Sequence, residues 1–279
     1  MSDWIEITDT DDPRLDDFRD LTTADRRPDR PGGRGLVIAE GTVVVRRLIT
    51  SSYPVRALLG VHRRFDELSA DLAGTDAPYY VVTPELMARV VGFHLNRGVL
   101  ATADRVRFPA AAELLESAGS VVVLEGVVDA ENLGSIFRNA AALGVGAVLL
   151  AAGCGDPLYR RSVRVSMGTV LLVPFTDLPG TWPEQVELLR DKGFTVVALT
   201  PGRKATALRH ADLAGRRVAL LLGSEGPGLS DEALAAADLR LRIPMAAGVD
   251  SLNVATAGAI AFAALAMLDR PWDPGGAAD

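Results

Sequence analysis

The chain has 279 residues, more than a single domain usually holds, so we expect two domains of unequal length. Hydrophobic residues make up 48% of it and aromatic residues only 5%, and the apolar mass is mostly Ala, Val and Leu. This composition favours helices packed on a buried parallel sheet and argues against an all-β fold. The single cysteine, Cys154, excludes an internal disulfide.

The formal net charge of −7 argues against a polyanionic partner, because binding to RNA relies on neutralising phosphates. The distribution of charge weakens that objection. Between Arg19 and Arg64 there are ten arginines and four acidic residues, and arginine suits bidentate phosphate contacts and stacking on bases. A general bias of the genome, with Ala, Gly and Arg all abundant, explains the excess equally well, so both interpretations stay open.

The N-terminus, MSDWIEITDTDD, lacks a basic region followed by an apolar core. The longest uncharged apolar stretch, Ala255 to Leu268, is shorter than the roughly 20 residues that a membrane span needs, and we expect a buried helix there. We therefore expect a cytoplasmic protein without a membrane span.

Short apolar runs in the first half predict a small α/β unit between about Arg34 and Ala103. Thr42 to Thr50 is strongly β-branched, so its assignment as a helix rests only on the alternating context. Thr83 and Pro84 predict a helix start, with Thr as N-cap and Pro at the first helical position. Residues 104 to 119 are interpreted as a linker and a short helix. Strands are expected at Leu36 to Glu40, Ala57 to Gly60, Tyr79 to Thr83 and Gly98 to Thr102.

The second half alternates strands and helices more regularly, which predicts a mostly parallel sheet with helices on both faces. Expected helices include Asn132 to Leu143 and Trp182 to Lys192, which end at Gly144 and Gly193 as C-capping favours. Ligands of such folds bind at the carboxyl ends of the strands, so the loops that follow the strands are the candidate sites. Strands are expected at Ser120 to Glu125, Gly146 to Ala151, Val170 to Phe175, Phe194 to Thr200, Arg217 to Leu222 and Leu239 to Ile243.

The first unusual loop follows the strand that ends at Glu125 and leads into Asn132, Gly134 and Arg138. Asn132 is a good N-cap, and Arg138 lies between one and two turns into the helix. Arg138 either has a functional role or projects to solvent from an amphipathic helix, and the local pattern alone allows both.

The second loop, LGSEGPGLS at 222 to 230, has three glycines and a proline within six residues. Such density lets the backbone approach a ligand closely. The loop matches neither a Walker loop nor the pattern G-x-G-x-x-G. The structural alternative is a tight turn before a helix that Ser230 caps.

The third loop begins with IPM at 243 to 245 and continues into SLNVA at 251 to 255. Asp250 or Ser251 can cap the long apolar helix that follows, and a helix N-terminus suits an anionic group. Asn253 is out of pattern at the start of so apolar a helix. Its side chain is therefore expected either to satisfy neighbouring backbone or to face a ligand.

Taken in order, the three loops resemble the three motifs of the SpoU branch, also called TrmH, of the SPOUT RNA 2'-O-ribose methyltransferases. The resemblance covers about Ser120 to Leu268, and Arg161 to Gly168 is similar to the family's segment between its first two motifs. The preceding unit resembles the family's small N-terminal RNA-binding domain, whose typical ending is similar to Phe93 to Val99.

The resemblance implies an α/β fold whose C-terminal SPOUT domain ties a deep trefoil knot around a mostly parallel sheet, an exception to unknotted topology. It also implies a homodimer with an active site completed across the interface, which fits a long Ala-rich helix that needs cover. We divide the chain into an acidic, mobile or partner-facing segment at 1–30, an N-terminal RNA-binding domain at 31–104, a linker at 105–118 and a methyltransferase domain at 119–279.

The implied activity is transfer of a methyl group from S-adenosyl-L-methionine to a ribose 2'-hydroxyl of RNA, with ribosomal RNA favoured over transfer RNA. The product of the cofactor is S-adenosyl-L-homocysteine. No metal is expected, because aligning the reactants suffices for such a displacement and the three histidines are scattered. The implied cofactor-binding residues are Leu199, Thr200, Gly223, Ser224, Glu225, Gly226, Ile243, Pro244, Met245, Ser251, Leu252 and Asn253.

In this family the arginine of the first motif, here Arg138, is tied to activation of the 2'-hydroxyl. Because arginine has a pKa above about 12 it is a poor general base, so we expect Arg138 to hold the target phosphate and stabilise the developing alkoxide. Asn132, Glu225 and Asn253 complete the expected catalytic set, with the last two organising the loops and the RNA. Further RNA contacts are expected from His94, Arg97, Arg161 and Arg164, and Arg160 is a candidate for the same RNA groove. The alternative for these residues is structural capping or a solvated basic face.

Two other classes of protein are less compatible with the sequence. A non-catalytic RNA-binding protein on the same fold would be expected to lose Arg138 or the loop glycines, and all are present. A nucleotide-dependent oxidoreductase would need a glycine fingerprint after the first strand and an acidic residue at the end of the second, and neither occurs. The sequence does not identify the RNA, the nucleotide, the proton acceptor, or a housekeeping as opposed to an antibiotic-resistance role.

Overall fold

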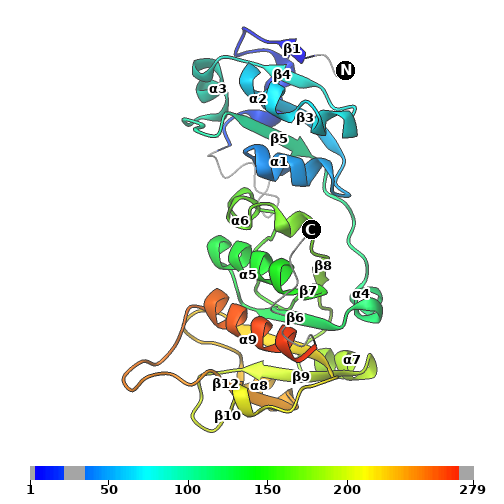
Figure 1. Cartoon of the computed structure of the whole chain (residues 1–279), viewed down its shortest axis with the longest axis vertical. Coiled ribbons are helices and arrows are strands. Elements are labelled where there is room, and N and C mark those ends of the chain that lie inside the picture. Colours follow the sequence, from blue (N-terminus) through cyan, green and yellow to red (C-terminus); the bar gives the residue numbers. More distant parts are fainter. Residues whose placement is uncertain (1–3, 22–34, 270–279) are drawn as a thin grey trace, which may run out of the picture. The chain divides into compact units, whose positions relative to one another are not determined.

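The computed structural model describes residues 4–21 and 35–269 of the chain (Figure 1). Contacts between Cα atoms divide it into two compact units. Over the described residues, the first unit consists of Met1–Arg107 with Asp156–Leu172, and the second of Phe108–Gly155 with Val173–Asp279. The segment 156–172 therefore belongs to the first unit, although the chain on both sides of it belongs to the second.

The first unit is built on a five-stranded mixed sheet with the order β1-β4-β3-β5-β2. β1, β4 and β3 run parallel, whereas β5 is antiparallel to both β3 and β2. All residues of β2, β4 and β5 are buried, because helices cover both faces of the sheet. The strands span Trp4–Glu6 (β1), Val37–Glu40 (β2), Val55–Gly60 (β3), Tyr79–Val81 (β4) and Val99–Ala103 (β5).

Short helices complete the first unit, and two of them test local predictions. Thr83 caps α3 as expected, since its Oγ1 accepts a hydrogen bond from the Leu86 amide. The β-branched run is helical as expected, because Val44 and Val45 of α1 are fully buried and packing overrides their weak propensity. The helices span Thr42–Ile49 (α1), His62–Leu68 (α2), Pro84–Val91 (α3) and Arg160–Val165 (α6), with 3-10 turns at Pro13–Phe18, Asp71–Gly74 and Thr169–Leu171.

Residues 4–21 are folded and not mobile as one alternative expected, whereas a partner-facing role of this segment stays a prediction. β1 pairs with β4, and Leu15 and Phe18 are fully buried in the core that α3 shares with the sheet. Acidic residues around them pair with arginines, so the acidic run is compatible with a folded surface; Asp17, for example, binds Arg56. The other residues of that predicted segment, 1–3 and 22–30, lie outside the described residues.

The predicted domain boundaries assign residues 156–172 to the methyltransferase domain, whereas their contacts belong to the first unit. α6 packs on β2. Arg47 donates a hydrogen bond to the Met167 carbonyl at 2.5 Å, and Arg105 binds the carboxylate of Asp156. These contacts join residues more than 50 positions apart, which a local sequence pattern does not reveal.

The second unit is built on a seven-stranded sheet with the order β10-β12-β9-β11-β6-β7-β8. Every pair of neighbouring strands runs parallel, which confirms the expected sheet type. The carboxyl ends of the strands therefore lie along one edge. The strands span Ser120–Glu125 (β6), Ala147–Leu150 (β7), Phe175–Asp177 (β8), Phe194–Leu199 (β9), Thr206–Ala207 (β10), Arg217–Gly223 (β11) and Leu239–Arg242 (β12).

Helices lie on both faces of this sheet (Figure 1). Successive side chains of a strand point to opposite faces, so each face contributes to its own core. Val121 and Val123 of β6 belong to a core with α4, α7 and α8, whereas α5 and α9 pack against each other in the layer on the opposite face. The trefoil knot implied by the resemblance stays a prediction. The helices span Ala111–Ser117 (α4), Ala130–Leu143 (α5), Glu184–Asp191 (α7), Asp231–Ala236 (α8) and Val254–Asp269 (α9).

Two local predictions in this half of the chain are wrong. Residues 170–175 do not form one strand, because the Ser166 hydroxyl accepts from the amides of Gly168 and Val170 and holds a 3-10 turn before β8. An apolar run alone does not distinguish such a buried turn from a strand. The N-cap of α5 is Asp129 and not Asn132, and its carboxylate accepts from the Asn132 amide at 2.9 Å.

Candidate active site

A cavity of about 520 Å³ opens at the carboxyl ends of three neighbouring parallel strands, β9, β11 and β12. Its walls are the loops that follow these strands and the start of α9, where open parallel sheets bind their ligands. The volume falls in the range of about 300 to 1,000 Å³ that small-molecule sites occupy.

The glycine-rich loop after β11 folds back on itself beside this cavity. A Cβ atom at Gly223 would lie 2.1 Å from the carbonyl carbon of Gly228 and 2.2 Å from the Leu229 nitrogen, so only glycine fits without moving backbone. Gly226 and Gly228 have φ angles of +89° and +78°, in the left-handed region that favours glycine. The Gly228 amide donates to the Ser224 carbonyl at 3.1 Å and closes the loop.

Glu125, the last residue of β6, anchors the end of this loop. Its carboxylate accepts hydrogen bonds from the Ser230 amide and hydroxyl, both at 2.8 Å, and from the Trp182 indole at 2.7 Å. Ser230 in turn caps α8 as predicted, accepting from the Ala233 amide at 3.2 Å. Sequence reasoning missed Glu125, although an acid that ends a buried strand next to the first motif was an available signal.

Asn253 connects all three loops. Its Nδ2 donates to Asn132 Oδ1 and to Glu225 Oε1, each at 2.7 Å. Its Oδ1 accepts from the Thr256 amide at 3.1 Å, so Asn253 caps α9, and the expectation that Asp250 or Ser251 does so is wrong. The structure thus brings together three of the four residues predicted to be catalytic. Asn253 therefore satisfies neighbouring backbone as expected, and it also lines the cavity, where contact with a ligand stays a prediction.

Arg138, the fourth, lies on a different part of α5. It follows Asn132 by six residues, about 9 Å along the helix axis, and its side chain is exposed. In the part of the chain that the structure describes, its guanidinium has no hydrogen bond or ion pair and does not line the cavity. Its five N–H donors are therefore available to a ligand or a second chain. Asn139, which sequence reasoning missed, ties α5 to α9 through the Ala255 carbonyl at 3.1 Å.

The cavity contains almost the whole set of residues predicted to bind the cofactor. Of the twelve predicted, only Pro244 is not among its lining residues. Their role in binding a cofactor stays a prediction. Eight further lining residues were not in the predicted cofactor-binding set, although five of them belong to the second and third loops. They are Pro201, Leu222, Pro227, Gly228, Leu229, Leu234, Val254 and Ala257.

Comparison with known proteins supports this picture. The model of the SpoU rRNA Methylase family matches residues 119–263, which contain all three loops. The chain belongs to the SpoU rRNA Methylase family. A relative from Mycobacterium tuberculosis, described as an uncharacterised tRNA/rRNA methyltransferase, is 56% identical over 92% of this chain and 90% of its own length.

Solved structures show the same α/β fold. An AdoMet-bound rRNA methyltransferase from Sinorhizobium meliloti superimposes with a TM-score of 0.77 at 25% identity, over 94% of this chain and 97% of that one. An RNA 2'-O ribose methyltransferase superimposes with a TM-score of 0.74 at 24% identity, over 93% and 97% of the two chains, which shows the fold alone. The family predicted from the three motifs is therefore confirmed.

The predicted RNA-contacting residues of this SpoU family member divide between the units. Arg138 belongs to the second unit, whereas the other candidates belong to the first. Arg160 is half-buried, and the side chains of the others are exposed, as an interface with a large ligand requires. The candidates in the first unit are His94, Arg97, Arg160, Arg161 and Arg164.

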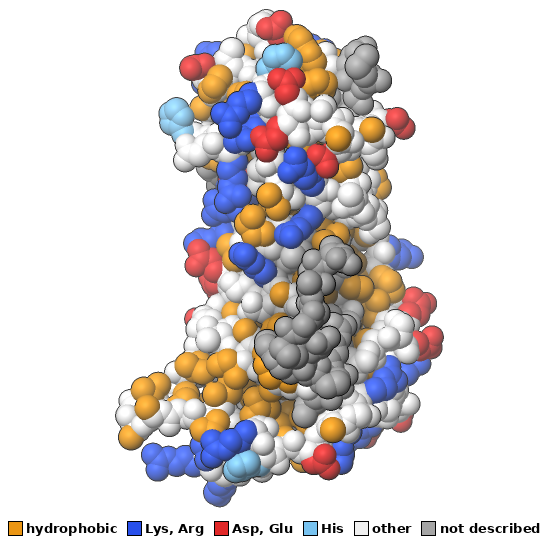
Figure 2. Space-filling model, in the orientation of Figure 1, with side chains coloured by type: hydrophobic (Ala, Val, Ile, Leu, Met, Phe, Trp, Pro, Cys, Tyr) orange, Lys and Arg blue, Asp and Glu red, His pale blue; other side chains and the backbone are white. Residues whose placement is uncertain are grey.

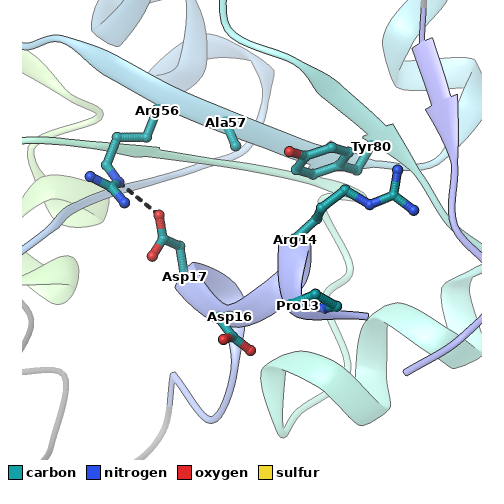
Figure 3. A pocket seen from close by; sticks show the side chains of 7 residues that line it. All are labelled: Pro13, Arg14, Asp16, Asp17, Arg56, Ala57 and Tyr80. Atoms are coloured by element: carbon teal, nitrogen blue, oxygen red, sulfur yellow. Dashed lines mark hydrogen bonds and ion pairs between the residues drawn. The ribbon is translucent and has the colours of Figure 1, made fainter. Parts of the chain in front are cut away.

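A second cavity, of about 500 Å³, lies in the first unit between the turn at Pro13–Phe18 and the sheet (Figure 3). Its charged groups compensate one another. Arg56 binds Asp17 at 2.7 Å, and Arg14 binds Asp12 and holds the pKa of that carboxyl at about 2. The arginines of this cavity are paired and carboxylates lie on its walls, so little positive charge remains to attract a polyanion.

Within residues 4–21 and 35–269, no group of three or more His, Cys, Asp or Glu side chains could hold a metal ion. Over the same ranges, no helix is both long and apolar enough to cross a membrane. Apolar side chains are exposed over α9 and the loop before it (Figure 2). They include Val249, Leu252, Ile260 and Met267, with exposed fractions of 51%, 38%, 41% and 65%.

Proposed function

We propose that this chain transfers a methyl group from S-adenosyl-L-methionine to a ribose 2'-hydroxyl of RNA, with ribosomal RNA favoured over transfer RNA. The observation that carries the proposal is the junction at Asn253, which lines the cavity and whose amide joins the first and second motif loops through Asn132 and Glu225. Membership of the SpoU family and the AdoMet-bound relative support the same activity.

The cavity fits a cofactor with an apolar base, a polar sugar and a charged end. Leu199, Ile243 and Leu252 offer apolar contacts, and the tight turn at Gly223 brings backbone groups to the wall. The carboxylate of Glu225 lies on the same wall and attracts positive charge. When bound, S-adenosyl-L-methionine supplies an electrophilic methyl group.

We assign Arg138 to the RNA. Guanidinium groups bind phosphate bidentately and stay protonated, so Arg138 is suited to hold the phosphate beside the target ribose and to stabilise the forming alkoxide. A phosphate oxygen of the RNA is our candidate for the proton acceptor. Asn132, Glu225 and Asn253 hold the loops in register by their mutual hydrogen bonds, which preorganises the site.

The proposal includes a homodimer and a cytoplasmic location, both carried over from the resemblance. The apolar side chains exposed on α9 support the dimer, because surfaces of this kind mark protein interfaces. Arg138 lies outside the cavity lining of its own chain, which agrees with a site that a second copy completes.

The test is transfer of labelled methyl groups from S-adenosyl-L-methionine to protein-free bacterial ribosomal RNA and transfer RNA, followed by alkaline hydrolysis. We expect label at linkages that resist alkali in the wild type. Arg138→Ala is expected to abolish the label and Arg138→Lys to lose most of it, since lysine lacks the bidentate geometry. The matched control is Arg216→Ala, because Arg216 is exposed and precedes β11, at the opposite end of that strand from the cavity.

Each outcome has a distinct meaning. Full activity of the Arg138→Lys variant contradicts the bidentate role. Label in alkali-labile positions contradicts ribose methylation, and cofactor binding without any transfer indicates another acceptor or a non-catalytic RNA-binding protein. Failure to bind the cofactor overturns the proposal.

A further inference from the structure

A buried carboxylate in the first unit lies between two arginines that come from distant parts of the chain. Glu40, the last residue of β2, has a side chain only 8% exposed. Its Oε1 lies 3.9 Å from Nε of Arg97, and its Oε2 lies 3.5 Å from a terminal guanidinium nitrogen of Arg160. One negative charge is thus shared by two positive charges, so the cluster has an excess of positive charge.

Arg160 is held in place by more than this ion pair. Its guanidinium carbon lies 4.7 Å from the centre of the Phe93 ring, a cation–π contact that does not itself require the N–H donors. Burial lowers the pKa of Arg160, Glu40 raises it, and the positive charge of Arg164 lowers it further. Arg164 therefore adds to the unbalanced positive charge at this place.

Arg97 is the more open member of the pair. Its side chain is 44% exposed and lies across Gly41, where a Cβ atom would come within 2.8 Å of Arg97 Cδ. Gly41 has a φ of +89°, so both its backbone conformation and the overlying side chain favour glycine. The absence of a side chain at Gly41 thus leaves room for the Arg97 side chain. Lys and Arg side chains gather over α1 and α6 in the space-filling view (Figure 2).

We propose that Arg97 and Arg160 form a phosphate-binding pair for the RNA backbone, with Glu40 beneath them as a positioning residue. Two guanidinium groups around one carboxylate retain donors for an added anion, and Arg–phosphate contacts are among the strong charge-assisted hydrogen bonds. The inference rests on the proposed function, which makes RNA the substrate. Under this proposal, the segment 156–172 has a function in the first unit, because it supplies Arg160.

The test measures RNA binding by the full chain without cofactor, so it does not depend on methyl transfer. The probe is protein-free bacterial ribosomal RNA in a filter-binding assay between 50 and 200 mM KCl. Removing one arginine that binds a phosphate is expected to make the negative slope of log K against log salt less steep by about 0.7 to 0.9, and to lower affinity at 0.15 M salt by about four- to sixfold. We expect this for Arg97→Gln and for Arg160→Gln, and about twice the reduction in slope for the double variant.

Arg56→Gln is the matched control, because Arg56 is 44% exposed in the same unit but is paired with Asp17 and Asp104. Its salt slope is expected to stay at the wild-type value. Arg160→Lys separates folding from binding, since it retains the charge but loses the planar contact with Phe93, and an intermediate affinity is expected. Glu40→Gln makes the chain more positive by one charge. If only net charge attracts the RNA, this variant is therefore expected to bind RNA more tightly. If Glu40 positions the two arginines, the variant is expected to bind RNA more weakly.

Unchanged salt slopes in folded Arg97→Gln and Arg160→Gln variants overturn the pair, whatever the outcome of the methyl-transfer assay. An equal loss in the Arg56→Gln control also overturns it, because the effect would then be one of net charge. Inorganic polyphosphate serves as a competitor. Competition as strong as that of RNA at equal phosphate concentration contradicts an RNA site, and weak competition supports one. Tighter RNA binding by the Glu40→Gln variant contradicts the proposed positioning role of Glu40.

Discussion

Replacing Gly223 by alanine tests whether the close fold of the glycine-rich loop builds the cavity. The added methyl group would lie 2.1 Å from the Gly228 carbonyl carbon, and ordinary contact begins near 3.4 Å, so the loop backbone must shift by more than 1 Å. Overpacking of this kind costs about 1 to 3 kcal/mol. Because residues 223–229 line the cavity, we expect cofactor affinity to fall by about 5- to 150-fold if this energy is lost from binding.

Gly119→Ala is the matched control. A Cβ atom at Gly119 meets nothing within 4 Å, and neither glycine has a φ in the left-handed region, so the two variants differ mainly in steric overlap. Gly119→Ala is expected to be neutral or to stabilise by up to about 1 kcal/mol. The assays are urea unfolding and calorimetric titration with S-adenosyl-L-methionine. Wild-type stability and affinity in Gly223→Ala would refute the reasoning, while lost stability without lost affinity would place the cofactor elsewhere.

Three further predictions concern single side chains. Asn253→Ala removes the cap of α9 and is expected to cost about 0.5 to 2 kcal/mol in urea unfolding, whereas Asn253→Ser keeps a capping oxygen and should lose methyl transfer with little loss of stability. Glu125→Gln replaces an acceptor facing Ser230 by a donor and is expected to cost about 2 kcal/mol, which an unchanged unfolding midpoint would contradict. Burial raises the pKa of Tyr53 to about 12, so its contribution to stability is complete below pH 10 and is lost as the pH rises towards 12. Tyr53→Phe should flatten the alkaline fall in unfolding midpoint, and an unaltered profile would count against this.

The sequence specified local features well where one residue decides the conformation. Thr83 and Ser230 cap their helices as predicted, and Gly144 ends α5 in the left-handed conformation. The strands β6, β7, β9, β11 and β12 begin and end close to their predicted bounds, because continuous apolar runs favour buried parallel strands. The short strand β10 was not predicted, and residues 170–175 were wrongly predicted to form one strand. Caps were less predictable where several side chains compete, as at Asp129 and Asn253.

The sequence predicted which residues belong to the candidate site, but not how their side chains contact one another. The three loops carried enough residue-specific signal for their family to be named, and eleven of the twelve residues predicted to bind the cofactor line one cavity. Parallel strands put their loops at one edge, so the sheet type alone predicted that these loops would meet.

Only the tertiary structure decided which side chains touch. The hydrogen bonds of Asn253 to Asn132 and Glu225, the anchoring of Ser230 by Glu125, and the return of residues 156–172 to the first unit all join positions far apart in the chain. Such contacts depend on strand order and on the packing of helices from distant segments, whereas caps, turns and periodicity are set by neighbours within a few residues. The sequence could therefore single out the loops, and Arg97 and Arg160 as candidate RNA contacts, but not the meeting of these two arginines at Glu40.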